Sequence, residues 1–286
     1  EIPLRLVGSE MCIRDRPIIA ASILGNTPSR LEEIPALDDV STICAVLNCL
    51  GIKVDASEPH VLNIDSTEIT SCEAPYELVR CMRASFLVMG PLLARKGKAR
   101  ISQPGGCAIG TRPIDLHLKG FEALGADIIE EDNHFIIKAD DLVGNKIDLD
   151  FPSVGATINI MLAAAKARGV TVINNAAREP EIVNVALFLN EMGAMISGAG
   201  TDTITIQGVK YLHSAVHRVI PDRIEAGTYL IIASLLGENL TIDNLDPIHL
   251  KCLTDLLIKS GVNMNINDTS IVITNVGDYK LSLIHI

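Results

Sequence analysis

Apolar and polar positions follow a pattern that recurs four times along the chain. Each copy has the end of an amphipathic helix, a glycine, and a short apolar strand, in the stretches LNCLGIKV (47–54), FEALGADI (121–128), LNEMGAMI (189–196) and LIKSGVNM (257–264). Glycine directly after the last helical turn is typical of a left-handed C-terminal cap. We therefore predict that four helices end at Gly51, Gly125, Gly193 and Gly261.

Further elements complete each copy. Alternating strands follow in HVLNIDS, HFIIKAD, DTITIQG and SIVITNV, and other strands precede the capped helices in ARISQ, VTVIN and LTIDN. Longer helices are predicted before those strands, over residues 76–97, 153–169 and 223–237. The unit is helix, strand, helix, strand, strand, and such units bury their apolar faces by packing together. The pattern therefore predicts an α/β (α+β) fold built of four repeats.

The second copy is longer than the others. The distance from Ile101, in its first strand, to the capping Gly125 is 24 residues, against 19 or 20 in the other copies. The additional residues fall in QPGGCAIGTRP (103–113). Packing explains what all copies share, but it does not explain an addition to one of them. Extra loop length on a rigid scaffold indicates function.

Cys107 lies within this loop. Arg112 and the helix start expected at Pro113 supply positive potential, which favours a thiolate. The neighbouring glycines let backbone N–H groups approach an anion closely. We therefore interpret Cys107 as a reactive thiol beside a phosphate or carboxylate site. A cysteine phosphatase loop is disfavoured, because CAIGTR has four residues between Cys and Arg where that class has five.

Other candidate residues have ordinary structural explanations. A free cysteine often fills space in the core, and we adopt that interpretation for the four in helical patterns, Cys44, Cys49, Cys81 and Cys252. Arg83 could bind a ligand or simply be solvated. His117, one turn into a predicted helix, is more typical of a hydrogen-bonded histidine than of a base. Asp222 and Glu225 have capping-box spacing.

Composition limits the possible classes of protein. The 286 residues correspond to about two domains, and 48% of them are hydrophobic. A net charge of −11 disfavours nucleic acid as the main partner. The longest apolar runs are shorter than the roughly 20 residues of a membrane span. The seven cysteines form no C-x-x-C pair and no cluster with metal-ligand spacing, which favours a reduced, cytosolic chain without a metal.

Five segments carry a family resemblance. The resemblance is to the UDP-N-acetylglucosamine enolpyruvyl transferases (UDP-N-acetylglucosamine 1-carboxyvinyltransferases) and runs from about Pro17 to Lys280. Its segments are, in chain order, MRAS, PGGCAIGTRPIDLH, FPSVGAT, NAAREPEIV and PDRIEAGT. The resemblance implies a cytoplasmic enzyme of the first committed step of peptidoglycan synthesis. It also implies two domains, each an inside-out α/β barrel of three repeats, and no metal or organic cofactor. The shikimate-pathway enolpyruvyl transferases share that fold but lack the Cys loop.

The resemblance also implies a reaction and its residues. Phosphoenolpyruvate is protonated at its methylene, the 3-hydroxyl of UDP-N-acetylglucosamine attacks C2, and phosphate leaves. Cys107 matches the family cysteine, which acts as general acid or in product release and is alkylated by fosfomycin. Arg83 matches a substrate-binding arginine. The uridine nucleotide would be held by Arg112, which lies near the phosphate groups, by Pro113, Ile114, Asp115 and Leu116, and by Ser153, Val154 and Gly155.

The chain departs from the family pattern at both ends. SEMCIRDR (9–16) stands where Lys-Asn-Ala-Ala is expected, and the family has six repeats, the last two carrying a catalytic aspartate and further arginines. LVGSEMCIRDR and LSLIHI resemble translated sequencing-adapter sequence. We therefore expect residues 1–16 and 281–286 to lie outside the native fold.

The remaining residues are expected to form one domain and part of another. Residues 17–219 would form a three-repeat domain with the Cys loop, and residues 220–280 the first repeat of a second domain. We expect little or no turnover from the chain as written. The alternative is a non-catalytic nucleotide-binding or scaffold remnant of the fold. The pattern indicates nothing about the oligomeric state.

Overall fold

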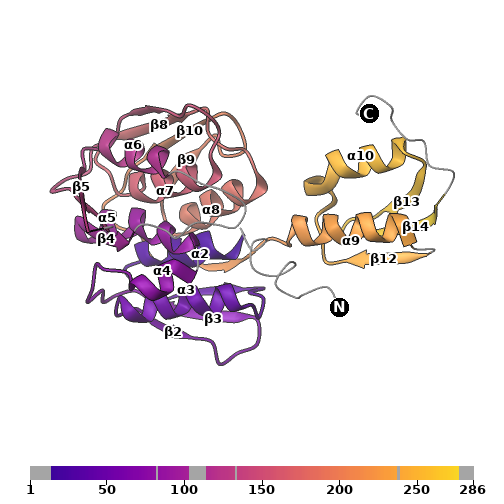
Figure 1. Cartoon of the computed structure of the whole chain (residues 1–286), viewed down its shortest axis with the longest axis horizontal. Coiled ribbons are helices and arrows are strands. Elements are labelled where there is room, and N and C mark those ends of the chain that lie inside the picture. Colours follow the sequence, from indigo (N-terminus) through magenta and orange to yellow (C-terminus); the bar gives the residue numbers. More distant parts are fainter. Residues whose placement is uncertain (1–13, 82, 103–113, 133, 237–238, 277–286) are drawn as a thin grey trace. The chain divides into compact units, whose positions relative to one another are not determined.

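The computed structural model describes residues 14–81, 83–102, 114–132, 134–236 and 239–276, and only the backbone at 80, 81, 83–85, 275 and 276. The chain divides between Val219 and Ile220 into two compact units. The larger unit is coloured indigo to salmon in Figure 1, and the smaller one orange and yellow. Each unit is described by itself.

The larger unit contains three copies of the predicted repeat. The first copy comprises α2 (Asp15–Ala21), η1 (Ser22–Leu24), β1 (Ser29–Glu32), α3 (Asp38–Cys49), β2 (Lys53–Asp55) and β3 (Val61–Asp65). The second comprises α4 (Tyr76–Cys81), η2 (Arg83–Val88), α5 (Met89–Lys96), β4 (Lys98–Ser102), α6 (Asp115–Ala123), β5 (Asp127–Glu131) and β6 (His134–Lys138). The third comprises α7 (Val154–Ala164), β8 (Val170–Asn174), α8 (Pro180–Glu191), β9 (Met195–Ser197) and β10 (Thr203–Gln207). Two short strands, β7 (Lys146–Asp148) and β11 (Val216–Arg218), follow the second and third copies.

All three sheets have the same strand order. The strand that comes last in each copy lies in the middle and is antiparallel to both neighbours, as β1-β3-β2, β4-β6-β5 and β8-β10-β9. In addition, a segment from the preceding copy pairs in parallel with the first strand of the next copy. These additions are β7 on β8, the bridge of Glu73 with Arg100 of β4, and β11 on β1. The last addition joins the third copy to the first, so the three copies form a ring.

The opening helices of the copies fill the centre of this ring. Residues 156–164 of α7 are all buried, as are all seven residues of α2 and residues 89–93 of α5. Figure 1 shows these helices between β8 and β10 on one side and β2 and β3 on the other. A helix that is apolar on all sides must be enclosed. The arrangement, with helices inside and sheets outside, is the inside-out α/β fold that the resemblance implies.

The four predicted helix ends are confirmed. Each capping glycine has a positive φ, 87° at Gly51, 92° at Gly125, 99° at Gly193 and 102° at Gly261. The predicted cap at Asp222, before α9 (Arg223–Leu236), is confirmed as well, because Asp222 Oδ1 accepts the N–H groups of Ile224 and Glu225 at 2.9 and 3.0 Å. Local pattern therefore predicts these termini well.

The prediction of one long helix over 76–97 is wrong. The segment divides into α4, the 3₁₀ helix η2 and α5, which begins again at Met89. Pro91 has no N–H to donate, and its ring crowds the carbonyl of Leu87, so a continuous helix is disfavoured there. The N–H of Gly90 instead donates to Asn159 Oδ1 at 2.8 Å. A tertiary contact thus replaces a helical hydrogen bond.

The first turn of α2 contains the last two residues of the segment expected outside the fold. Arg16 donates to Asp39 Oδ2 at 2.7 Å, and both side chains are buried. Asp15 is fully buried, and its Oδ2 has no hydrogen-bond partner among the described residues. Loss of solvation raises the pKa of the Asp15 carboxyl to about 6.

The smaller unit is a single copy of the repeat. It comprises α9 (Arg223–Leu236), β12 (Leu240–Asp243), η3 (Pro247–Leu250), α10 (Lys251–Lys259), β13 (Val262–Ile266) and β14 (Ser270–Val276). Its sheet has the order β12-β14-β13, as in the other copies. The core lies around Leu230, Ile271 and Ile273. Unlike α2 and α7, helix α9 exposes apolar side chains, with Leu235 63% and Leu236 82% exposed.

Candidate functional site

The described residues of the predicted site come from the beginnings of two helices. Asp115 is the first residue of α6 and is exposed, whereas Ile114 before it and Leu116 after it are buried. Ser153 is the N-cap of α7, and its hydroxyl accepts the N–H of Ala156 at 3.4 Å. Val154 and Gly155, both partly exposed, form the first turn of α7. The site therefore has one part in the second repeat and another in the third.

His117 brings the two helix starts together. A Cβ atom on Gly155 would lie 3.2 Å from both Cε1 and Nε2 of the His117 ring. The absence of a side chain at Gly155 therefore makes room for His117, one turn into α6. Further along the two helices, Gly120 of α6 lies directly against the side chain of Ile160 of α7. The segments around Asp115 and Ser153, far apart in sequence, are thus neighbours in the fold.

The His117 side chain is buried in a polar network. Asn159 Nδ2 lies 3.1 Å from His117 Nδ1 and donates to the carbonyl of Phe86 at 3.0 Å. The Phe86 ring meets the imidazole edge-on, with centroids 5.1 Å apart. The expectation of a hydrogen-bonded histidine at this position is confirmed. Asn159 was not predicted, although a polar residue inside the apolar run ATINIMLAAA is a usable signal for a buried network.

The electrostatics of the two helix starts suit an anionic ligand. Each helix N-terminus carries partial positive charge and N–H groups without partners inside the helix. The turn after β8 supports α7 from the side, because Thr157 Oγ1 accepts the N–H of Ala177 at 3.1 Å. The described part of the site offers donors, one exposed carboxylate at Asp115 and an enclosed imidazole. The helix starts therefore favour an anionic group, whereas the Asp115 carboxylate disfavours one beside it and can accept hydrogen bonds from hydroxyl or N–H groups of a polar ligand.

Several predicted site residues fall where less is described. Cys107, Arg112 and Pro113 lie outside the described residues, and α6 begins at Asp115, two residues beyond the start predicted at Pro113. Arg83 is the first residue of η2, and only its backbone is described. Ser102 and Ile114 mark the two described ends of the Cys loop. The site roles of these residues remain predictions.

Of the four cysteines predicted to fill space, one packs partly buried against the core, two do not, and the side chain of Cys81 lies outside the described residues. Cys49 and Cys252 are exposed, so the prediction is wrong for both. The buried stripe of α3 is formed by Ile43, Val46 and Leu47, and Cys49 lies off that stripe. Cys44 is partly buried, and burial, with the nearby Asp15 carboxylate, raises its thiol pKa to about 11. Cys44 is therefore a poor nucleophile.

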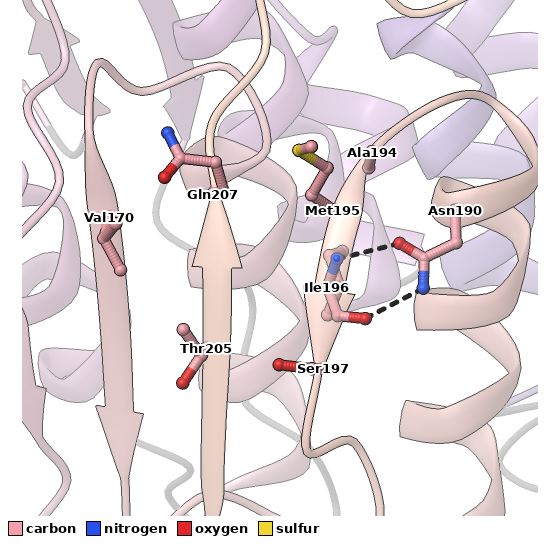
Figure 2. A pocket seen from close by; sticks show the side chains of 8 residues that line it. All are labelled: Val170, Asn190, Ala194, Met195, Ile196, Ser197, Thr205 and Gln207. Carbon is pink, nitrogen blue, oxygen red and sulfur yellow. Dashed lines mark hydrogen bonds between the residues drawn. The ribbon is translucent and has the colours of Figure 1, made fainter.

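A separate hollow lies over the β8-β10-β9 face. It measures about 460 Å³ and is lined by Val170, Asn190, Ala194, Met195, Ile196, Ser197, Thr205 and Gln207. Figure 2 shows the Asn190 amide on its rim, bonded to both the N–H and the carbonyl of Ile196, at 2.8 and 2.9 Å. None of the predicted site residues whose side chains are described lines this hollow.

Two classes of feature are not found in the described parts of the chain. No group of three or more His, Cys, Asp or Glu side chains in those parts could hold a metal ion. Nor does any helix in them have the length and apolar character needed to cross a membrane.

The sequence is similar to several characterised proteins. A family model described as EPSP synthase (3-phosphoshikimate 1-carboxyvinyltransferase) matches residues 6–286. The UDP-N-acetylglucosamine 1-carboxyvinyltransferase 1 of Caldanaerobacter subterraneus subsp. tengcongensis is 52% identical over 265 residues, covering 92% of this chain and 63% of that protein. UDP-N-acetylglucosamine 1-carboxyvinyltransferase 2 of Carboxydothermus hydrogenoformans is 57% identical over 250 residues, with 87% and 59% covered. The chain thus spans about three fifths of the length of these relatives.

Solved structures with the same fold are also enolpyruvyl transferases. NikO from Streptomyces tendae superposes with a TM-score of 0.81 at 23% identity, covering 93% of this chain and 64% of that chain. An EPSP synthase from Acinetobacter baumannii superposes with a TM-score of 0.69 at 17% identity, with 94% and 64% covered. At these identities the superpositions establish the fold. Because the family model covers nearly the whole chain and the curated relatives share half or more of the aligned residues, the chain belongs to the EPSP synthase family of enolpyruvyl transferases.

Proposed function

We propose that the protein transfers the enolpyruvyl group of phosphoenolpyruvate to the 3-hydroxyl of UDP-N-acetylglucosamine and releases phosphate, in peptidoglycan synthesis. The observation that carries this proposal is the 50–57% identity to proteins named UDP-N-acetylglucosamine 1-carboxyvinyltransferase. The neighbouring helix starts at Asp115 and Ser153–Gly155 support it, because they suit a nucleotide diphosphate. Since the chain spans about three fifths of those relatives, the proposal concerns the whole protein.

In the proposed reaction the charges shift without a cofactor. The methylene carbon of phosphoenolpyruvate gains a proton and becomes a methyl group, while the sugar hydroxyl loses its proton to a base and adds to C2 to give a tetrahedral ketal. The C2–O bond to phosphate then breaks and the methyl carbon gives up a proton, which leaves the enolpyruvyl ether and free phosphate. Donors aimed at the phosphate and carboxylate would stabilise the charge as it redistributes.

Each predicted residue has a role in this scheme. Cys107 would act as general acid or in product release, from a loop whose described end is the start of α6. Arg83 and Arg112 would bind the anionic groups of the substrates. Pro113 to Leu116 and Ser153 to Gly155 would hold the nucleotide between the second and third repeats.

Alkylation by fosfomycin tests this proposal directly. We expect one adduct, mapped to Cys107 by peptide mass spectrometry, with a rate that increases when UDP-N-acetylglucosamine is present. Cys49 and Cys252 are exposed and serve as internal controls for unselective alkylation, and Cys107→Ser should abolish the adduct. Equal labelling of Cys49 or Cys252, with no effect of the nucleotide, would instead support a non-catalytic remnant.

Phosphate release by the gene product tests the substrate. The whole protein, as distinct from the chain as written, should release phosphate from phosphoenolpyruvate when UDP-N-acetylglucosamine is added and not when shikimate 3-phosphate is added. Release with shikimate 3-phosphate alone would assign the protein to the other branch of the family.

A further inference from the structure

The polar network around Asn159 determines the tautomer of His117. The N–H of Gly90 can only donate, so the atom of Asn159 that it meets at 2.8 Å is the carbonyl oxygen. The carbonyl of Phe86 can only accept, so the atom of Asn159 that it meets at 3.0 Å is the amide nitrogen. The orientation of the Asn159 amide is therefore defined by two backbone groups.

The second amide proton of Asn159 is then directed to His117. Nδ2 lies 3.1 Å from Nδ1 of the imidazole, which must accept the proton through its lone pair. A ring that accepts at Nδ1 is neutral and carries its proton on Nε2. Nε2 is the atom that lies beside Gly155, at 3.2 Å from the position of an added Cβ.

The same network holds three helical segments at close range. A Cβ on Gly90 would lie 2.6 Å from Asn159 Oδ1, so α5 and α7 approach each other as closely as glycine allows. Asn159, with no exposed surface, joins η2 and α5 of the second repeat to α7 of the third. His117, 9% exposed, extends this junction to the first turn of α6.

From this geometry we propose that His117 is a positioning residue. Held as the neutral Nε2–H tautomer by Asn159, it keeps the first turn of α6 in register with the first turn of α7. Asp115 and Ser153 then present one composite surface to the nucleotide. The identity of the ligand rests on the proposed function, whereas the tautomer and the register do not.

His217 offers a matched control in the same unit. It is 5% exposed, its Nε2 lies 2.6 Å from Asn184 Nδ2, and its ring lies 5.1 Å from that of Phe188. His217 belongs to β11 and the closure of the ring, and it is not among the predicted site residues. If nucleotide affinity falls only because a buried histidine has been removed, it should therefore fall equally at both positions.

The tautomer is measured on the unmodified chain. In a two-bond ¹H–¹⁵N spectrum of histidine-labelled protein near neutral pH, we expect the His117 signals to show a protonated Nε2 and an unprotonated Nδ1. Their assignment comes from the signals that vanish in His117→Asn. A protonated Nδ1 would overturn the proposal without reference to any ligand.

The positioning role is measured with variants and with UDP-N-acetylglucosamine as probe. In His117→Asn the new carbonyl oxygen can still accept from Asn159, but the side chain no longer reaches Gly155. We expect the dissociation constant for the nucleotide to rise about ten- to a hundredfold in His117→Asn and to change less than twofold in His217→Asn. Equal weakening in both variants would overturn the proposal.

The two proposals fail separately. If the unmodified protein does not bind the nucleotide, the proposed function fails. The register is then tested by the backbone amide signals of Ser153, Val154 and Gly155, which should shift in His117→Asn and remain in place in His217→Asn. Unchanged signals in both variants would overturn the positioning role.

Discussion

Asp15 introduces an ionisable group into the core of the larger unit. Its side chain has no exposed surface, and burial raises its pKa to about 6 from an ordinary value near 3.8. Above pH 6 the folded protein therefore holds a buried carboxylate that the unfolded chain would solvate. The native state binds the proton more tightly than the unfolded state, so this group makes stability decrease as pH rises from about 4 to 6.

Replacing Asp15 should stabilise the larger unit. At pH 7.5 we expect Asp15→Ala to gain up to about 3 kcal/mol in the free energy of unfolding, the size that the raised pKa implies. The gain should shrink toward zero as the pH falls to about 4. Denaturant titrations at several pH values measure it, with Asp38→Ala, an exposed position in the first turn of α3, as control. A gain that is the same at pH 4 and 7.5 would contradict the assignment.

Thiol reactivity should follow exposure and not position in a helical pattern. A pKa of about 11 leaves Cys44 with roughly a hundredfold less thiolate at pH 8 than its ordinary value of 9.0 would allow. We expect iodoacetamide to modify the exposed Cys49 and Cys252 first and Cys44 at least about tenfold more slowly. Peptide mapping over a time course measures the rates, and comparable rates would show that Cys44 is accessible and ionised.

At the scale of elements, glycines set how closely the central helices approach. Gly90 leaves no room for a methyl group, because the nearest atoms belong to the main-chain carbonyl and the side-chain amide of Asn159. Gly227 in α9 differs, since an added Cβ would meet only the ends of Leu253 and Leu250, at 3.2 and 3.4 Å. Both are helical positions, which makes the pair a useful comparison.

The two glycines should respond to alanine in opposite directions. Gly90→Ala should cost the larger unit about 1–3 kcal/mol through overpacking against α7. Gly227→Ala should be neutral or stabilise the smaller unit by up to about 1 kcal/mol, because alanine favours a helix and the leucine ends can shift. Calorimetry, which can follow the two units separately, measures both. A harmless Gly90→Ala would show that α5 and α7 can separate without cost.

At the scale of the whole molecule, one short strand closes the larger unit. β11 pairs in parallel with β1, through Arg30 with Val216, Leu31 with His217 and Glu32 with Arg218. His217 also approaches Glu191 Oε2, at 2.8 Å from its Nδ1, which connects the strand to α8. Without β11 the outer edge of β1 would lose its partner, and an open edge favours aggregation.

Chains cut on either side of this strand should therefore behave differently. A chain of residues 14–219 should unfold cooperatively on heating, as followed by circular dichroism. A chain of residues 14–211, which ends before β11, should melt at a lower temperature or aggregate. Replacing His217 by Asn in the longer chain separates the effect of the side chain from that of the strand. Equal melting temperatures for the two chains would show that the ring closes without β11.

Much of the local structure could be predicted from the sequence. The four capping glycines, the strands after them and the cap at Asp222 depend on contacts within a few residues, so their patterns are local. The site residues Ile114 to Leu116 and Ser153 to Gly155 came from the family resemblance. The contact between their helices depends on His117 and Gly155, and no local pattern indicates it.

By itself, the sequence determined the repeat, its order of elements and the ends of its helices, because hydrophobic period and capping act over short distances. Only the tertiary structure decided the strand order within each sheet, the closure of the ring by β11 and the exposure of Cys49. It also decided the break between α4 and α5. There the side chain of Asn159 accepts the N–H of Gly90, which in a continuous helix would donate to a backbone carbonyl. These features depend on partners distant in sequence, and which of these partners a side chain contacts is determined only when the whole unit packs.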